Sequence, residues 1–407
     1  MSKEKRRVPK LRFPGFTEDW EQRKLCQITT RVTRKNGDQS DLPLTISAQD
    51  GLVDQRKYFN RQVASRDMSN YYLIKKGEFA YNKSYSEGYP FGAVKRLDYY
   101  DIGALSTLYI LFEITDNNIS SDFIVSYYMT HLWYKEISKR AAEGARNHGL
   151  LNISTEDFFD SELNIPNSIE EQVKIGNFIK QFDKFITLHQ RKLDNLKLKK
   201  KALLQKLFPK NGERYPELRF PGFTDAWEQR KADYIFKSVT DKGYPELPVL
   251  SASQELGMVY RDQNGIDIQH DQKNETSYKR VLPGQFVIHL RSFQGGFAYS
   301  EIEGITSPAY TVMSFKHSSE QYGLFWKHVF KSKTFIKRLE TITYGIRDGR
   351  SISFSDFKSL LLQYPSFSEQ KLIGDSIAVI ERGITLHQRK LDHLKLQKKA
   401  LLQQMFV

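Results

Sequence analysis

Cysteine is almost absent from this chain of 407 residues, which contains a single one, Cys26. A lone cysteine excludes a disulfide within the chain and is typical of the reducing cytoplasm, where we expect the protein to reside. Cys26 lies in a segment without histidine, so we expect a structural role for it and not a nucleophilic one. No run of about 18 apolar residues exists, and no apolar segment follows the basic start at 1–7. The sequence therefore predicts neither a membrane span nor a signal peptide.

Catalytic and metal-binding motifs are missing as well. The sequence has no Gly-x-x-x-x-Gly-Lys-Ser/Thr loop for nucleotide phosphates, no His-Glu-x-x-His, no Cys-rich zinc pattern and no Pro-Asp dipeptide that would open a metal-dependent nuclease motif. The segment nearest to a methyltransferase pocket, at 307–310, lacks the second proline, and no glycine-rich cofactor loop accompanies it. We therefore expect no catalytic site, no metal site and no cofactor in this chain.

Acidic residues are outnumbered by basic ones. The 62 Lys and Arg exceed the 48 Asp and Glu, which gives a formal net charge of +14 and a pI of about 9.4. This excess favours a polyanionic partner, either a nucleic acid or an acidic membrane surface. The hydrophobic fraction of 39% is sufficient for packed cores, and the length suggests roughly two or three domains.

The chain is a tandem repeat with a period of about 200 residues. The segment LRFPGFTEDWEQRK at 11–24 returns as LRFPGFTDAWEQRK at 218–231, with 12 of 14 positions identical. ITLHQRKLDNLKLKKKALLQKLFP at 186–209 returns as ITLHQRKLDHLKLQKKALLQQMFV at 384–407, with 19 of 24 positions identical. Such a period is too long for a solenoid and indicates a duplicated domain with its helix.

The segments between the matching ends, 26–165 and 232–364, share only a skeleton. Leu42-Pro43 corresponds to Leu247-Pro248, and Gly77 corresponds to Gly284. One scaffold with different surface residues is what two recognition domains for two different targets would have. Neutral drift of a duplicated domain is the alternative, although drift would also have altered the ends.

Each repeat ends in a segment with the heptad spacing of a long helix. Apolar residues, interrupted by His189 and Lys200 in the first copy and by His387 and Lys398 in the second, recur in alternating steps of four and three. We expect the two helices to pair within the chain, with an intermolecular coil as the alternative. The apolar seam residues are Ile175, Ile179, Phe182, Ile186, Leu193, Leu196, Leu203 and Leu207 in the first copy, and Ile373, Ile377, Ile380, Ile384, Leu391, Leu394, Leu401 and Met405 in the second.

Two polar features of these helices remain open to interpretation. Facing seam histidines are compatible with zinc binding, but no second pair of ligands lies three or four residues away, so we expect a polar pair that sets the register. The basic outer face of the first helix is either simply solvated or contacts phosphate or a partner protein. Its residues are Arg191, Lys192, Lys197, Lys199, Lys200, Lys201 and Lys206.

The variable segments predict small sheets with flanking helices. Short apolar-alternating runs, punctuated by Gly, Asp and Asn, occur at 72–74, 78–81, 108–114, 285–290 and 311–315. Amphipathic stretches at 121–140 and 320–341 each predict a helix. The predicted fold class is α+β, with two mixed α/β domains in tandem, separated by two long helices that form an antiparallel coiled coil.

Polar and basic loops lie at matched places in the two repeats, one after the strand that follows Gly77 or Gly284 and one before each long helix. Asn, Gln, Arg and Lys read base edges in the major groove, and Lys and Arg also hold phosphates. The candidate DNA-binding residues are Arg56, Lys57, Arg61, Asn82, Lys83, Ser84, Tyr85, Arg146, Asn147 and His148 in the first repeat, and Arg261, His289, Arg291, Ser292, Gln294, Arg347 and Arg350 in the second.

These features together resemble the specificity subunit of Type I restriction-modification systems. The resemblance is carried by the two LRFPGF…WEQRK blocks, by the Glu-Gln pairs at 171–172 and 369–370, and by the two LHQRKLD…KKALLQ helices. GARNHGLLNIS at 144–154 is similar to the family's segment before its first long helix, whereas the second repeat departs from it with GIRDGRSISFS at 345–355. The resemblance covers essentially the whole chain.

The resemblance implies that each variable domain reads one half of an interrupted double-stranded DNA target, and that the antiparallel helices set the gap. It also implies two methylation (M) subunits that carry S-adenosylmethionine, and restriction and translocation (R) subunits that use ATP and magnesium, with no cofactor in this chain. The expected segments are a target recognition domain at 1–165, a spacer helix at 166–210, a second recognition domain at 211–364 and a second helix at 365–407. The alternatives are a stand-alone DNA-binding regulator and a coiled-coil adaptor.

Overall fold

The computed structural model describes residues 6–61, 63–141, 151–210, 212–253, 256–261, 272–289, 296–342 and 352–407. The chain divides into two compact units: unit 1 comprises Met1–Gln190 and Arg389–Val407, and unit 2 comprises Arg191–Gln388. Both bounds fall inside the two long helices, α5 (Ile169–Lys206) and α10 (Phe367–Met405), so each unit contains a part of each helix. The units therefore cut across the four segments expected from the sequence.

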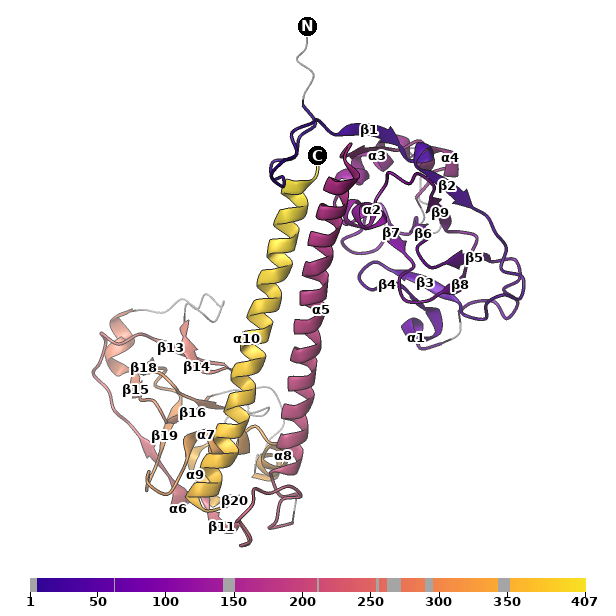
Figure 1. Ribbon diagram of the computed structural model, residues 1–407. Coiled ribbons are helices and arrows are strands. Elements are labelled where there is room, and N and C mark those ends of the chain that lie inside the picture. Colours follow the sequence, from indigo (N-terminus) through magenta and orange to yellow (C-terminus); the bar gives the residue numbers. More distant parts are fainter. Residues whose placement is uncertain are drawn as a thin grey trace. The chain divides into compact units, whose positions relative to one another are not determined.

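Short strands and short helices build the described globular part of unit 1 (Figure 1). They are β1 (Glu21–Lys24), β2 (Thr29–Val32), β3 (Leu44–Ser47), β4 (Gly51–Asp54), β5 (Tyr72–Lys75), β6 (Phe79–Asn82), β7 (Ala93–Arg96), β8 (Ile102–Leu105), β9 (Ile110–Ile114) and β10 (Glu162–Ile165). The short helices are α1 (Gln55–Phe59), α2 (Ser121–Tyr128), α3 (Leu132–Arg140) and α4 (Thr155–Phe159).

Unit 2 repeats the series of strands, but its first helix follows the first strand and not the fourth. Its strands are β11 (Glu228–Lys231), β12 (Phe236–Val239), β13 (Leu250–Ser253), β14 (Gly257–Tyr260), β15 (Lys279–Val281), β16 (Phe286–Ile288), β17 (Phe297–Tyr299), β18 (Gly304–Thr306), β19 (Thr311–Phe315) and β20 (Leu361–Tyr364). Its short helices are α6 (Ala232–Ile235), α7 (Gly323–Val329), α8 (Lys333–Ile342) and α9 (Phe354–Ser359).

The strand pairing is the same in both units. Unit 1 has a four-stranded antiparallel sheet in the order β2-β9-β6-β7, and unit 2 has the corresponding sheet β12-β19-β16-β17. The two-stranded pairs β1-β10, β3-β4 and β5-β8 return as β11-β20, β13-β14 and β15-β18. Gly77 and Gly284 stand at equivalent turns before β6 and β16 with φ of 89°, a conformation that favours glycine. One scaffold is therefore built twice, as the repeat predicts.

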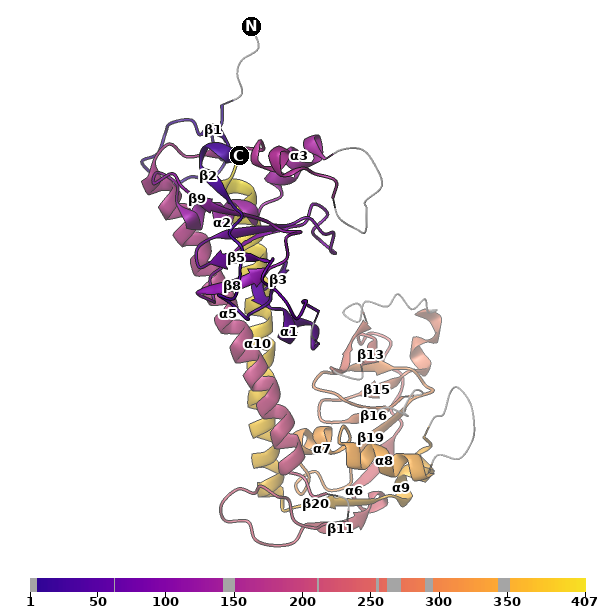
Figure 2. The same ribbon diagram turned by 90° about the vertical axis from the view of Figure 1, so that its right-hand side faces the viewer.

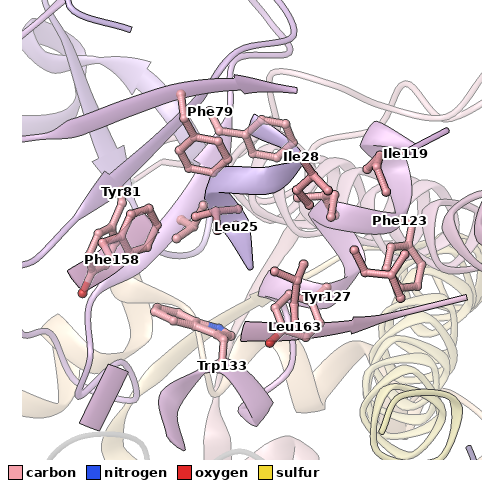
Figure 3. Packing of buried hydrophobic residues seen from close by; sticks show 14 of the residues in the cluster. Leu25, Ile28, Phe79, Tyr81, Ile119, Phe123, Tyr127, Trp133, Phe158 and Leu163 are labelled. Atoms are coloured by element: carbon pink, nitrogen blue, oxygen red, sulfur yellow. The ribbon is translucent and has the colours of Figure 1, made fainter. Parts of the chain in front are cut away.

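Aromatic side chains fill the larger core of unit 1 (Figure 3). Tyr81 of β6 stacks on Phe158 of α4 at 4.5 Å between ring centroids, and Trp133 of α3 meets Tyr81 edge-to-face at 5.9 Å. Because these rings come from three elements, they fix α3 and α4 against the sheet. Cys26, by contrast, is exposed, so the structural role expected for its side chain is not a packing role.

The helices predicted at 121–140 and 320–341 are each broken in two, into α2 and α3 and into α7 and α8. The hydroxyl of Thr130 donates to the carbonyl of Tyr127 at 2.7 Å and accepts from the backbone at the start of α3 at 3.2 Å. The hydroxyl of Ser332 likewise accepts from the first turn of α8 at 3.2 Å. The prediction of continuous helices was wrong because hydroxyl side chains offer the backbone an alternative to helical hydrogen bonds.

The two long helices pair within the chain and run antiparallel. In unit 1 the start of α5 packs against the end of α10, and in unit 2 the end of α5 packs against the start of α10. The buried seam residues are Ile175, Ile179, Leu193, Leu207, Ile373, Ile377, Ile380, Leu391 and Met405, and the half-buried ones are Phe182, Ile186, Leu196, Leu203, Ile384, Leu394 and Leu401. The predicted fold class is confirmed. Within the described part of the chain, no helix has the length and hydropathy needed to cross a membrane.

Two buried ion pairs attach the repeated LRFPGF blocks to the long helices. Arg12 binds Glu171 through two parallel hydrogen bonds of 2.7 and 2.8 Å, and Arg219 binds Glu369 through two of 2.8 Å. Both carboxylates are only 1% exposed. The adjoining glutamines are also buried, and the carboxamide of Gln172 donates to the Pro166 carbonyl at 2.9 Å. The Glu-Gln pairs therefore hold each block and each helix start together.

Candidate nucleic-acid interface

The first candidate segment in unit 1 is α1, which follows β4 (Figure 2). The buried carboxylate of Asp54 caps α1, accepting from the backbone N of Arg56 at 3.0 Å and pairing with its guanidinium at 3.1 Å. Burial raises the pKa of Asp54, but the hydrogen bonds from Arg56 outweigh it and lower the pKa below its ordinary value. Asn60 ends α1 with a φ of 50°, in the left-handed region. The cap and the ion pair fix the conformation of residues 55–61, here called the α1 tip. The Arg56 side chain remains 48% exposed.

Cations and aromatic rings share this tip. Lys57 and Arg61 are exposed, as the sequence prediction requires of phosphate contacts. Tyr58 and Phe59 are 51% and 43% exposed, and their rings lie edge-to-face at 5.0 Å. Sequence reasoning missed these two aromatics, although the run QRKYFNR interleaves them with the cations. The tip offers both positive charge for phosphates and flat apolar surface for sugars or bases.

The second candidate segment in unit 1 is the loop after β6. The side-chain oxygen of Asn82 accepts from the backbone N of Ser84 at 3.0 Å, and the Lys83 ammonium donates to the Ile153 carbonyl at 3.3 Å. Asn82 and Lys83 therefore hold the loop itself, which makes them less suited to base contacts than the sequence suggests. Ser84 is half-buried, whereas Tyr85 is 55% exposed. Tyr85 is the outward-facing member of this group.

The candidates in unit 2 lie at the ends of equivalent strands. His289 follows β16 as Asn82 ends β6, and its half-buried ring lies 6.2 Å from that of Tyr310. Burial lowers the pKa of His289, so its imidazole is neutral at neutral pH and presents one donor and one acceptor. Arg261 follows β14, and its Nε and Nη1 are covered and have no hydrogen-bond partner among the described residues. Both side chains are partly enclosed and more constrained than the open α1 tip.

The other predicted contacts lie outside the described residues. These are Arg146, Asn147, His148, Arg291, Ser292, Gln294, Arg347 and Arg350. The described part of the chain places no group of three or more His, Cys, Asp or Glu where it could hold a metal ion. The described candidates are thus polar and basic side chains at strand ends and loops, carried by two scaffolds with the same strand pairing.

A basic chain that builds one recognition scaffold twice on a shared pair of long helices defines a tandem DNA-recognition subunit. Residues 18–198 match the family model described as "Type I restriction modification DNA specificity domain". The resemblance drawn from the sequence is confirmed: this match and the relatives described below support a specificity subunit of the Type I restriction-modification class.

Two similar proteins span nearly the whole chain. A protein of Methanocaldococcus jannaschii described as a type I restriction enzyme MjaX specificity subunit is 22% identical over 416 residues, covering 97% of this chain and 94% of its own. The crystal structure of the Type I restriction-modification S subunit from M. genitalium matches with a TM-score of 0.60 and 14% identity, covering 98% of this chain and 99% of its own. The latter similarity shows that the fold is shared.

Proposed function

We propose that units 1 and 2 each read one half of a two-part double-stranded DNA target and that the long helices fix the gap between the halves. The observation that carries this proposal is the identical strand order of the two units, combined with different sequences in the matched segments that follow β6 and β16. One scaffold with two sets of side chains gives two base preferences in a single chain. The net charge of +14 supplies salt-sensitive attraction to the duplex.

The direct test is to sequence the methylated bases in a host that expresses the partner subunits with and without this chain. We expect one two-part motif that depends on the chain. Replacing Lys57 and Arg61 by alanine should weaken DNA binding similarly across sequences and reduce the salt slope by about 1 per lost phosphate contact, with the motif unchanged. Methylation that does not depend on the chain would favour the stand-alone regulator or the adaptor.

The chain would dock two methylation subunits through its long helices. In unit 1, Leu188 of α5 and Leu396 of α10 are 46% and 66% exposed, and in unit 2, Leu198 and Leu386 are 65% and 64% exposed. The repeat relates Leu188 to Leu386 and Leu198 to Leu396. Exposed leucines at repeat-related positions in both units favour two copies of one partner.

Replacing Leu188 and Leu396 together by aspartate should remove one methylation subunit and leave the one on unit 2 bound. Each buried leucine contributes about 1.5–3 kcal/mol, so losing two weakens docking by at least about 100-fold. Native mass spectrometry of the assembled complex reads the stoichiometry directly. Aspartate at the exposed positions Asn195 and His393 is the matched control for added charge. Unchanged stoichiometry in the leucine variant would place the docking surface elsewhere.

In this proposal the chain supplies recognition and no chemistry. S-adenosylmethionine would be bound by the methylation subunits, and ATP and magnesium by the restriction subunits. The proposal is supported by the match of residues 18–198 to the DNA specificity domain and by the lack of nucleotide and methyltransferase motifs in the sequence.

A further inference from the structure

Two ion pairs connect α5 with α10, one in each unit. In unit 1 the Lys398 ammonium donates a hydrogen bond to a carboxylate oxygen of Asp183, and in unit 2 Lys200 Nζ lies 2.7 Å from Glu381 Oε1. Each lysine and each acid lies 198 positions from its counterpart, the same offset that relates the two helices in the sequence repeat. The two pairs are therefore one interaction made twice, with the roles of the helices exchanged.

Both lysines occupy seam positions, where the heptad pattern otherwise places mostly apolar residues. The side chains of Lys398 and Lys200 are 15% and 31% exposed, so both lysines are largely covered by their neighbours. An ammonium group in such a place is costly unless it is paired. In the observed alignment the acid on the facing helix supplies this partner.

A shift by one heptad would still place apolar residues opposite one another along most of the seam, but it would separate these charges and withdraw the helix ends from the cores of the two units. Asp183 would then face Leu391 or Met405, and Lys398 would face Gly176 or Gln190. Leucine and isoleucine at other seam positions are nearly interchangeable, so the apolar seam alone discriminates poorly between alignments seven residues apart. Seven residues correspond to about 10.5 Å of helix, or about 3 base pairs of duplex. Polar seam pairs are a known means of setting register.

The pair in unit 2 is also tied to the globular part. Lys327 of α7 lies 3.4 Å from Glu381, and the buried His328 of α7 contributes to the same electrostatic environment. Burial raises the pKa of Glu381, but the hydrogen bond from Lys200 and the nearby cations outweigh it and lower the pKa to about 2. In unit 1, Lys398 Nζ also lies 3.2 Å from the sulfur of Met129, just after α2. Each pair thus lies where the recognition scaffold meets the helices.

We propose that the Lys398–Asp183 and Lys200–Glu381 pairs fix the register of the helices and thereby set the gap length that the subunit accepts in DNA. The inference rests on the proposed reading of a two-part target. It assigns these four residues a positioning role, because none of them needs to touch DNA.

The test uses the full chain with its partner subunits and a set of duplexes whose gap varies one base pair at a time. The wild type should prefer one gap length over gaps changed by 3 base pairs by at least about tenfold. Asp183→Lys with Glu381→Lys leaves four lysines unpaired and should reduce this preference to about threefold or less. Restoring opposite charge with Lys398→Asp and Lys200→Asp should restore the preference, while the half-site sequences stay unchanged throughout.

Several outcomes distinguish the possible failures. Glu170→Lys in the exposed Glu170–Lys174 pair of α5 is the control, and it should not alter gap preference. If the lysine double variant does not fold, Asp183→Asn with Glu381→Gln removes the same attraction without adding charge. Unchanged gap preference in a folded double variant, or no recovery in the charge-exchanged variant, overturns the register proposal. Absence of any gap preference in the wild type instead overturns the proposed function.

Discussion

Replacing Arg12 by methionine is expected to lower the free energy of unfolding of unit 1 by about 3–5 kcal/mol, because the partner carboxylate is left buried and unpaired. Glu171 is 1% exposed and receives two hydrogen bonds from Arg12, whose own side chain is 11% exposed. The hydrogen bonds that Arg12 donates to Glu171 raise the pKa of Arg12 further, so the guanidinium is charged at every practical pH. Hydrogen exchange of the amides in unit 1, followed against urea, measures the loss.

The chain contains its own controls for this change. Arg219→Met removes the equivalent pair with Glu369 and should produce a loss of similar size confined to unit 2. Arg6 pairs with Asp19 in the same N-terminal block, but the two side chains are 74% and 45% exposed, so Arg6→Met should cost at most about 1 kcal/mol. Combining Arg12→Met with Glu171→Leu should recover much of the stability, since no charge is then left buried. Equal losses for Arg6→Met and Arg12→Met would contradict this account.

These ion pairs could not be predicted from the sequence. The Glu-Gln motif is visible in the sequence, but its partner Arg12 lies 159 residues away from Glu171, and no local pattern connects them. The long helices were predictable because a heptad period is a local property repeated over many residues. The breaks after α2 and α7 were not, since they depend on hydroxyl hydrogen bonds from single residues such as Thr130.

The residues of the candidate interface were also predicted only where a local pattern marks them. Composition identified the cations of α1, and the structure places Lys57 and Arg61 on an exposed tip. Composition did not reveal that Lys83 is tied to the Ile153 carbonyl, 70 residues away, because loop packing is decided by tertiary contacts. Tyr58 and Phe59 were missed because exposed aromatic rings cannot be told from core rings by residue type alone.

A fragment that ends at Lys210 is expected to form a homodimer. Truncation removes Leu402, Met405 and Phe406 from the core of unit 1. The repeat supplies their equivalents, Leu204, Leu207 and Phe208, in every copy of the fragment. Light scattering should give twice the fragment mass at micromolar concentration, and methylation with the partner subunits should occur at a symmetric two-part site.

Equivalent aromatic contacts in the two units indicate that Phe208 can take the place of Phe406. Phe406 meets Trp20 edge-to-face at 6.1 Å in unit 1, and Phe208 meets Trp227 in the same way at 6.0 Å in unit 2. Phe208 of a second copy would therefore fill the site beside Trp20 that truncation leaves open.

The ion pair between the two helices can also form in a homodimer of the fragment. Asp183 would meet Lys200 of the other copy in place of Lys398, so the ion pair is conserved as well. Burying three such apolar side chains at each end contributes about 1.5–3 kcal/mol per side chain, enough to offset the cost of association. Phe208→Asp should keep the fragment monomeric, because it places a charge in this core. A wild-type fragment that stays monomeric at tens of micromolar would mean that the two helix ends are not interchangeable.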